Sequence, residues 1–202
     1  MTSTIITLVR HGKVEGPAAV YGRTDIALSA AGHSDLKRTL NNLHAQNPIN
    51  QIISSPKNRC LQVAQEFSAQ YEVPLRTEDN LQEMDFGIWD SVPFDELGDE
   101  WKKIEAFWES PHSMQPPEGE SLTDFASRVI SSWESLINNN KPGHHAIICH
   151  GGVIRILIAH ILQLDWRNPA LFKQLQIDYA SHTRIEIGDY DGAVPVVRWI
   201  GS

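Results

Sequence analysis

The chain has 202 residues, a formal net charge of −8 and no run rich in lysine or arginine. A chain of this length can bury a core without disulfides or structural metals, and we expect a single domain over residues 1–202. The acidic balance argues against nucleic-acid binding through a basic face. Two cysteines are too few for a disulfide framework or a four-thiolate zinc site.

No apolar segment has the length or composition of a membrane span. The longest, residues 153–164, is interrupted by Arg155, His160 and Gln163. Residues 1–4 lack the basic charge of a signal peptide. We therefore expect no membrane partner and a cytoplasmic location.

Short apolar runs alternate with amphipathic segments along the chain, a pattern typical of α/β proteins. Buried strands are predicted where apolar residues follow one another without alternation, at 5–9, 51–54 and 146–149. Helical spacing predicts helices from about residue 29, over 57–71, from 121 and over 153–164. Alternating residues at 183–187 and 194–199 predict an edge hairpin.

Residues 86–117 differ from the rest because they are rich in tryptophan, acidic residues and proline and are only partly periodic. We interpret them as an insertion between sheet elements that roofs a pocket, and not as a separate folding domain. His144 and His145, just before the third predicted strand, are expected to be solvated.

Two of the predicted strands end in a histidine followed by glycine. The first ends in Arg10, His11 and Gly12, and the third leads into His150 and Gly151. The carboxyl ends of strands in open α/β sheets face the ligand crevice, and glycine lets the backbone approach a ligand closely. One such histidine is as often a packed core residue, but two at equivalent strand ends favour a functional site.

An arginine follows the second predicted strand. Ser54-Ser55-Pro56 closes that strand, and Arg59 falls in the first turn of the next helix. Taken alone, Arg59 would more often be a solvated surface residue. At this position its guanidinium and the helix N-terminal amides share one sheet edge, an arrangement suited to an anion.

These motifs together resemble the histidine phosphatase superfamily, which has the phosphoglycerate-mutase-like fold. The matching segments follow the family order and are 8–12, 54–59, Glu83 within 81–87, and 150–152, with 22–32 similar to the family's segment before its first helix. The resemblance implies a three-layer α/β/α sandwich with a mostly parallel central sheet and a helical cap insertion at about 86–117.

The resemblance also implies a reaction on a small phosphorylated substrate without metal or cofactor. His11 is expected to be the nucleophile that forms a phosphohistidine. Arg10, Arg59, His150 and Gly151 are expected to bind the phosphate, and His150 also to stabilise the transition state. A phosphate dianion needs such local positive charge in a chain that is acidic overall.

Glu83 is expected to protonate the leaving alkoxide and then to deprotonate the attacking water. It matches the family's Leu-x-Glu pattern, although Glu78, Asp79 and Asp85 lie close in sequence and a charged loop is often only a solvated surface. Lys13, Tyr21 and Gly22 are expected to form a loop on the substrate side.

Within the superfamily, residues 81–90 and 117–121, with Arg128 downstream, resemble the α-ribazole phosphatase branch. This implies hydrolysis of α-ribazole 5'-phosphate to α-ribazole in cobalamin biosynthesis. Aromatic residues of the insertion either stack on the flat base or merely pack the cap; they are Trp89, Trp101, Phe107 and Trp108. The alternatives are a broad sugar-phosphate or nucleotide phosphatase, a phosphoglycerate-mutase-type enzyme, and a non-catalytic phosphoprotein-binding module.

The sequence departs from the family pattern in three places. Lys13-Val14 replaces an acidic or polar pair, Pro17 replaces an asparagine that often contacts the phosphate, and Cys149 replaces a serine. The first two changes affect the substrate-side loop and leave the expected phosphate pocket intact. An edge hairpin near the C-terminus would permit a dimer, but the sequence does not determine the oligomeric state.

Overall fold

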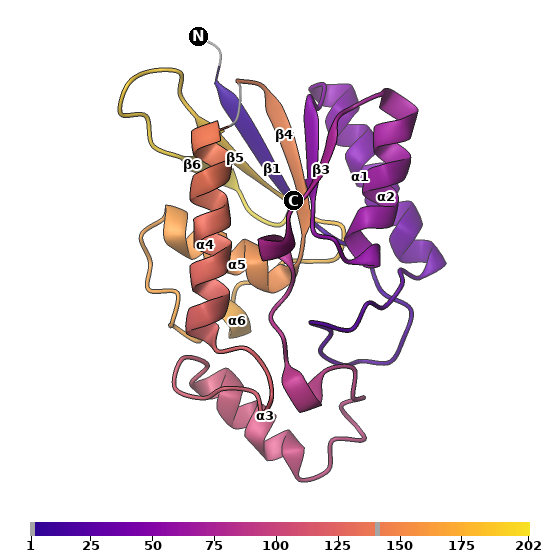
Figure 1. Ribbon diagram of the computed structural model, residues 1–202, viewed down its shortest axis with the longest axis vertical. Coiled ribbons are helices and arrows are strands. Elements are labelled where there is room, and N and C mark those ends of the chain that lie inside the picture. Colours follow the sequence, from indigo (N-terminus) through magenta and orange to yellow (C-terminus); the bar gives the residue numbers. More distant parts are fainter. Residues whose placement is uncertain (1–2, 140–141) are drawn as a thin grey trace.

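The computed structural model describes residues 3–139 and 142–202, and within them six strands form one sheet in the order β3-β2-β4-β1-β5-β6 (Figure 1). The strands are β1 (Thr4–Arg10), β2 (Gln51–Ser54), β3 (Leu75–Thr77), β4 (His144–Cys149), β5 (His182–Ile187) and β6 (Val196–Trp199). The α-helices are α1 (Ala30–Gln46), α2 (Asn58–Tyr71), α3 (Glu100–Glu109), α4 (Leu122–Asn139), α5 (Gly151–Ile161) and α6 (Ala170–Lys173). Two short 3-10 helices are η1 (Asp79–Leu81) and η2 (Gly87–Trp89). Residues 1–2, part of the stretch from which no signal peptide was expected, lie outside the described residues.

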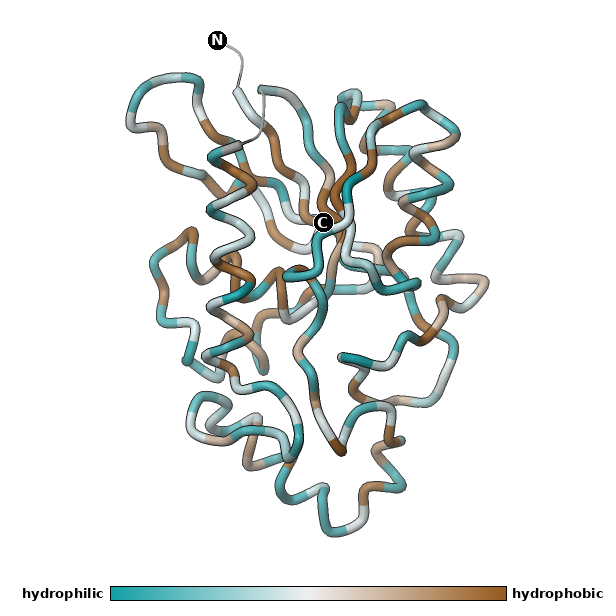
Figure 2. The backbone as a smooth tube through the Cα atoms, viewed as in Figure 1, coloured by the Kyte–Doolittle hydropathy of each residue, from teal (hydrophilic) through white to brown (hydrophobic). Residues whose placement is uncertain are grey.

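Helices cover both faces of the sheet because its central strands are apolar on both faces (Figure 1). Successive side chains of a strand point to opposite faces. Ile6 and Leu8 of β1 therefore join the core under α4 and α5, whereas Val9 joins the core under α1 and α2. Figure 2 shows the hydrophobic residues gathered along these strands, with hydrophilic residues on the outer helices.

The strand register places the ends of β1, β2 and β4 at one edge. β1 and β2 both pair in parallel with β4, and β3 pairs in parallel with β2. β5 runs antiparallel to β1, and β6 runs antiparallel to β5. The predicted three-layer α/β/α fold with a mostly parallel sheet is confirmed.

Several element boundaries differ from those predicted. The last long helix begins at Gly151 instead of residue 153, and it ends at Ile161 because Gln163 adopts a left-handed backbone with φ of 56°. β6 begins only at Val196, after Pro195, which has no backbone N–H to donate to a sheet. The predicted hairpin does form, but only β6 lies at the edge, since β5 pairs with β1.

The expectation that His144 and His145 are solvated was wrong. Both belong to β4 and are 3% exposed. The Nδ1 of His144 donates to the carbonyl oxygen of Asn47 at 2.9 Å, and its Nε2 accepts from Thr7 Oγ1 at 2.8 Å. These bonds give each ring nitrogen of His144 a hydrogen-bond partner inside the sheet, and burial lowers the pKa of His144.

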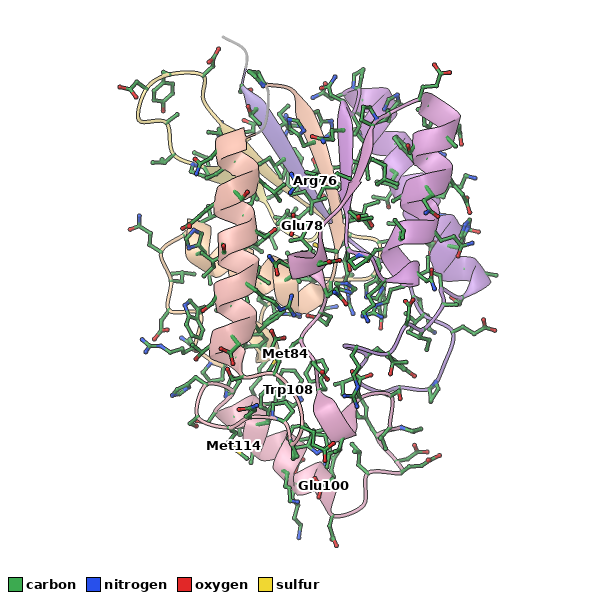
Figure 3. The ribbon with its side chains drawn as sticks, in the orientation of Figure 1. Arg76, Glu78, Met84, Glu100, Trp108 and Met114 are labelled. Carbon is green, nitrogen blue, oxygen red and sulfur yellow. The ribbon has the colours of Figure 1, made fainter. Side chains whose placement is uncertain are left out.

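The insertion at 86–117 contains η2 and α3 and lies beyond the carboxyl-terminal edge of the sheet (Figure 1). The ring of Trp108 on α3 packs against Phe86, Phe107 and Phe172. Figure 3 marks Met84 and Trp108 where the segment after η1 approaches α3. Among the described residues, no helix combines the length and apolar character needed to cross a membrane.

Candidate active site

The ends of three parallel strands bring the basic candidates together. Arg10 ends β1 and is in register with Cys149, the last residue of β4. His11 directly follows Arg10, and His150 directly follows Cys149; the centroids of the two histidine rings lie 5.2 Å apart. Arg59 lies in the first turn of α2, which follows β2, and its Nε reaches the ring of His150.

His11 is held as a neutral imidazole with one nitrogen free. Its Nδ1 lies 2.8 Å from the carbonyl oxygen of Gly12, which only accepts, so Nδ1 carries the proton and Nε2 keeps its lone pair. Burial lowers the pKa of His11 well below its usual value, and the charges of Arg59 and Arg10 lower it further. At neutral pH this is the form that a nucleophile requires.

Arg10 has one buried donor without a partner. Its guanidinium lies over the ring of Tyr179 at 3.9 Å, and its Nη1 donates to the carbonyl oxygen of Ile177 at 2.5 Å. Its Nε is buried and makes no hydrogen bond with any described residue. An unsatisfied buried N–H beside His11 is suited to a phosphate oxygen.

Arg59 is fully buried and donates mainly to protein acceptors. It donates to the carbonyl oxygens of Tyr21, Gly22 and Thr24 at 2.8 to 3.1 Å. Its Nε donates to His150 Nδ1 at 3.2 Å. These four bonds use four of the five N–H groups of a guanidinium, so Arg59 fixes the 21–24 loop and His150. Neither Arg59 nor His150 lines the cavity that holds His11, and both act there from directly behind it.

Both ring nitrogens of His150 are engaged. Nδ1 accepts from Arg59, so Nε2 carries the proton and donates to Ser55 Oγ at 2.8 Å. Burial lowers the pKa of His150 well below its usual value, and Arg59 lowers it further. Gly151 begins α5, and a helix leaves its first backbone N–H groups without intrahelical partners.

Glu83 reaches the same place from the irregular segment after η1. Its Oε2 accepts from the backbone N–H of Gly152 at 3.0 Å, and its Oε1 accepts from that of Met84 at 3.1 Å. The carboxyl thus sits at the N-terminus of α5, one residue beyond the pair formed by His150 and Gly151. Of the acidic residues near it in sequence, neither Glu78, Asp79 nor Asp85 lines the cavity that holds His11.

Glu83 lines two adjoining cavities that also share Phe86 and Trp108, and it lines a third cavity with Arg128 and Glu120. The first, of about 150 Å³, is lined by Arg10, His11, Tyr21, Glu83 and Tyr179, among others. The second has a volume of about 100 Å³. Four of its eight lining residues are aromatic, and one residue besides Glu83 is charged; these are Phe86, Trp108, Phe125, Phe172 and Arg155.

Of the residues expected to form the substrate-side loop, some line the cavities and others do not. Tyr21 lines the first cavity, whereas the Lys13 side chain is exposed and lines neither cavity. Gly22 contributes its carbonyl to Arg59 and its N–H to Asp90. Of the four aromatic residues proposed to stack on a base, Trp108 alone lines these two cavities, since Trp89 and Phe107 are buried and Trp101 packs beside Phe94.

The sequence analysis did not identify two further residues at the pocket. Tyr179 lies beside His11 with 5.7 Å between ring centroids, and it comes from an irregular segment that no pattern marks. Asp90 accepts three backbone N–H groups, those of Gly22, Arg23 and Thr24, at 2.7 to 3.0 Å. In the sequence, Asp90 is one of several acidic residues of the insertion, and no pattern distinguishes it from the others.

A family model described as the histidine phosphatase superfamily, branch 1, matches residues 6–199. The chain belongs to this superfamily. The predicted family is thereby confirmed, and the sheet edge that carries Arg10, His11, Arg59 and His150 lies inside the matched region. Within residues 3–139 and 142–202, no three His, Cys, Asp or Glu side chains form a group that could hold a metal ion.

Known proteins resemble this histidine phosphatase over nearly all of its length. The bifunctional protein Rv2228c of Mycobacterium tuberculosis is 27% identical over 199 residues, which cover 96% of this chain and 53% of that protein. The chain thus spans about half the length of the curated relatives that it matches.

Solved structures share the fold. YhfR of Bacillus stearothermophilus superposes with a TM-score of 0.87 at 25% identity, covering 98% of this chain and 97% of that one. The α-ribazole phosphatase of Shigella flexneri gives 0.82 at 21% identity over 98% and 96% of the two chains. The mycobacterial glucosyl-3-phosphoglycerate phosphatase Rv2419c gives 0.83 at 20% over 98% and 99%. The last two likenesses show the fold and leave the substrate of this chain open.

Proposed function

We propose that this histidine phosphatase hydrolyses phosphomonoesters without a metal ion, through a phosphohistidine formed on His11. The observation that carries the proposal is the state of this ring: neutral, with Nδ1–H fixed on the Gly12 carbonyl and the Nε2 lone pair free in a cavity that Arg10 also lines. An anion is attracted there by guanidinium charge, and the imidazole is ready to attack phosphorus.

In the first step, His11 Nε2 forms a bond to phosphorus while the bond from phosphorus to the leaving oxygen breaks. The carboxyl group of Glu83 donates its proton to that oxygen. In the second step, water attacks the phosphohistidine, Glu83 takes the water proton, and the bond from phosphorus to Nε2 breaks. Inorganic phosphate and the starting enzyme result. Arg10 and the first amides of α5 would stabilise the charge on the transferred phosphoryl oxygens.

We propose α-ribazole 5'-phosphate as the substrate, and α-ribazole for cobalamin biosynthesis as the product. The leaving group departs toward Glu83, and the second cavity, which Glu83 also lines, is lined by Phe86, Trp108, Phe125 and Phe172. A flat apolar base suits such a lining. The cytoplasmic location and the single domain remain predictions.

The test is phosphate release in excess EDTA from α-ribazole 5'-phosphate, sugar phosphates, nucleotides and 3-phosphoglycerate, with the His11→Ala variant as the blank. Strong preference for α-ribazole 5'-phosphate would support both the chemistry and the substrate. Similar rates across the panel would support the proposed phosphohistidine mechanism and overturn the proposed substrate. No release from any of them would overturn the proposal in favour of a phosphate-binding module.

A further inference from the structure

We propose that Arg128 and Glu120 are a positioning pair that sets the place of the Glu83 carboxyl group and so its ability to act as the general acid. This inference rests on the proposed function, because it concerns the proton that Glu83 delivers. Arg128 and Glu120 line a cavity of about 500 Å³ together with Glu83, but they do not line the cavity that holds His11, so neither is offered as a catalytic residue.

The Glu83 segment receives little support from regular structure. It follows η1 and precedes η2, and residues 82–86 belong to no helix or strand. Among the described residues, neither Glu83 nor Met84 makes a backbone–backbone hydrogen bond. The Glu83 carboxylate accepts from the backbone N–H of Gly152, and the position of the Glu83 backbone depends on side chains that bind the segment around it.

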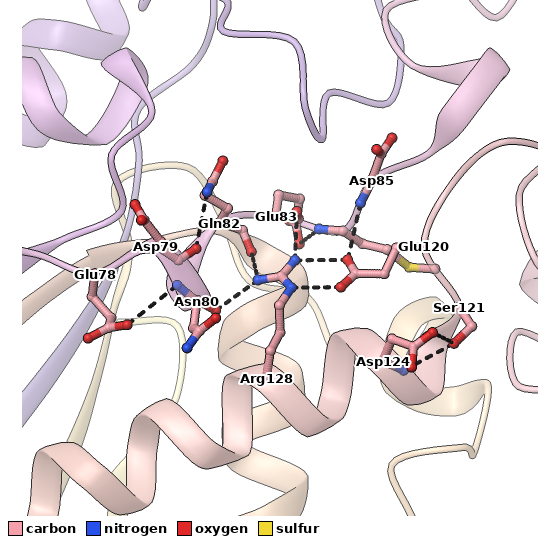
Figure 4. Close-up of polar contacts among 11 residues, drawn as sticks. Glu78, Asp79, Asn80, Gln82, Glu83, Asp85, Glu120, Ser121, Asp124 and Arg128 are labelled. Carbon is pink, nitrogen blue, oxygen red and sulfur yellow. Dashed lines mark hydrogen bonds and ion pairs between the residues drawn. The ribbon is translucent and has the colours of Figure 1, made fainter.

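Arg128, on α4, binds that backbone with its whole guanidinium (Figure 4). Nη1 donates to the carbonyl oxygens of Asn80 and Gln82, both at 2.8 Å, and Nη2 donates to that of Glu83 at 3.1 Å. Nε and the remaining Nη2 hydrogen donate to the two carboxylate oxygens of Glu120 at 2.7 and 2.8 Å. All five N–H groups of the guanidinium are thus in use.

Glu120 holds the segment on the other side of Glu83. Its Oε2 accepts from the backbone N–H of Asp85 at 3.4 Å, and its own backbone N–H donates to the Asp85 carbonyl oxygen at 2.9 Å. Figure 4 shows Glu83 between these two sets of contacts. Because the side chains of Arg128 and Glu120 are only 22% and 16% exposed, the bidentate pair is largely shielded from competing water.

The fork geometry of Arg128, and not its charge alone, is what this arrangement needs. A lysine at this position keeps the charge but cannot serve three carbonyl oxygens and both oxygens of Glu120 at once. Loosening the segment would move the Glu83 carboxyl away from the leaving oxygen. It would leave the contacts of His11 and Arg10 as they are, since those come from strand ends.

The experiment compares Arg128→Lys and Glu120→Gln with Glu83→Gln, on an aryl phosphate with a good leaving group (p-nitrophenyl phosphate) and an alkyl phosphate with a poor one (glycerol 3-phosphate). Arg184→Lys is the matched control, since Arg184 pairs with Glu186 at similar exposure, 26% and 21%, on β5. General acids contribute about 100-fold or more, so we expect kcat/KM on the alkyl phosphate to fall at least about tenfold in both pair variants, because this ratio covers the steps up to loss of the leaving group and not the later hydrolysis of the phosphohistidine. The aryl phosphate should change less than about threefold, because its leaving oxygen needs little protonation.

A double variant decides whether the effect runs through Glu83. In the Glu83→Gln background, Arg128→Lys should cause no further loss on the alkyl phosphate, because the group that it positions is already gone. Equal slowing of both substrates, or a full additional loss in the double variant, would overturn the positioning role. If Arg128→Lys fails to fold, Glu120→Gln carries the same test.

The outcomes separate this inference from the proposed function. If Glu83→Gln slows alkyl phosphates selectively and the pair variants do not, the general acid stands and the positioning role is overturned. If Glu83→Gln itself shows no selectivity, Glu83 is not the acid and both ideas about it are overturned, while loss of activity in His11→Ala still supports the phosphohistidine.

Discussion

The two sides of the pocket are built in different ways. On the phosphate side, Arg10, His11 and His150 sit at the ends of β1 and β4, where the parallel register fixes their spacing. On the leaving-group side, Glu83 belongs to no regular element: its carboxylate accepts from the backbone N–H of Gly152, and its backbone lies between contacts to Arg128 and Glu120. The phosphate side thus depends on backbone pairing in the core of the sheet, and the leaving-group side on a few side chains. Changes on the first side should affect every substrate alike, and changes on the second should depend on the leaving group.

The largest effect is expected at the nucleophile. His11→Ala should reduce turnover of both aryl and alkyl phosphates by at least about 1000-fold, because neither substrate can bypass the phosphohistidine. Steady-state phosphate release measures this, with circular dichroism to show that the variant is folded. Turnover of p-nitrophenyl phosphate within about tenfold of the parent enzyme would contradict the nucleophilic role.

Two neighbouring glycines of α5 separate the two sides. A Cβ at Gly152 would lie 2.3 Å from Glu83 Oε1, so Gly152→Ala must displace that carboxylate. We expect alkyl phosphates to slow by about 100-fold and aryl phosphates by much less. A Cβ at Gly151 would lie 2.9 Å from Arg155 Nη1 and at an ordinary contact distance, 3.4 Å, from Arg10 Nε, so Gly151→Ala shifts the end of the Arg155 side chain and not the Glu83 carboxylate and should leave the ratio of aryl to alkyl rates nearly unchanged. The same profile for the two variants would abolish the distinction between the sides.

Asp90 should have a smaller effect that does not depend on the leaving group. Its carboxylate accepts three backbone N–H groups of the loop whose carbonyl oxygens Arg59 binds. Asp90→Asn weakens charge-assisted bonds worth about 1.5–3 kcal/mol each, so we expect a lower Tm and a KM raised by about tenfold for aryl and alkyl phosphates together. An unchanged Tm with a selective loss on alkyl phosphates would place Asp90 on the leaving-group side instead.

The smallest effect is expected from pH. The pKa values of His11 and His150 are lowered in the folded protein, so below about pH 6.5 the unfolded chain binds more protons than the folded one. Their contribution to stability is complete above that pH and decreases as the pH falls toward the folded values. We expect the free energy of unfolding in urea to fall between pH 7 and 5.5, and to fall less in His11→Asn. An identical pH dependence in that variant would contradict the lowered pKa of His11.

The same contrast explains what the sequence predicted. The strands at 5–9, 51–54 and 146–149 were found because a buried parallel strand reads as an apolar run, and the residues that follow them are brought together by register alone. The site residues on the phosphate side were therefore accessible from the sequence, while their roles stay predictions.

The elements that the sequence did not predict depend on tertiary contacts. β3 is three residues long and α6 four, too short for a periodic signal. α3 lies within the segment expected to form a helical cap and buries Ile104 and Phe107, but nearby proline and glycine obscured its bounds. Nor does any local pattern show that Arg128 binds carbonyl oxygens 45 to 48 residues earlier in the chain.

The strand order also governs when the site can form during synthesis. β4 lies between β1 and β2, so the first two strands of the chain do not touch each other in the sheet. Thr7 and its partner His144 are 137 residues apart. On the ribosome, the N-terminal two thirds of the chain must therefore wait, with β1 and β2 unjoined, until β4 emerges and inserts between them. His11 meets His150 only at that late moment, so an incomplete nascent chain carries no assembled phosphate pocket.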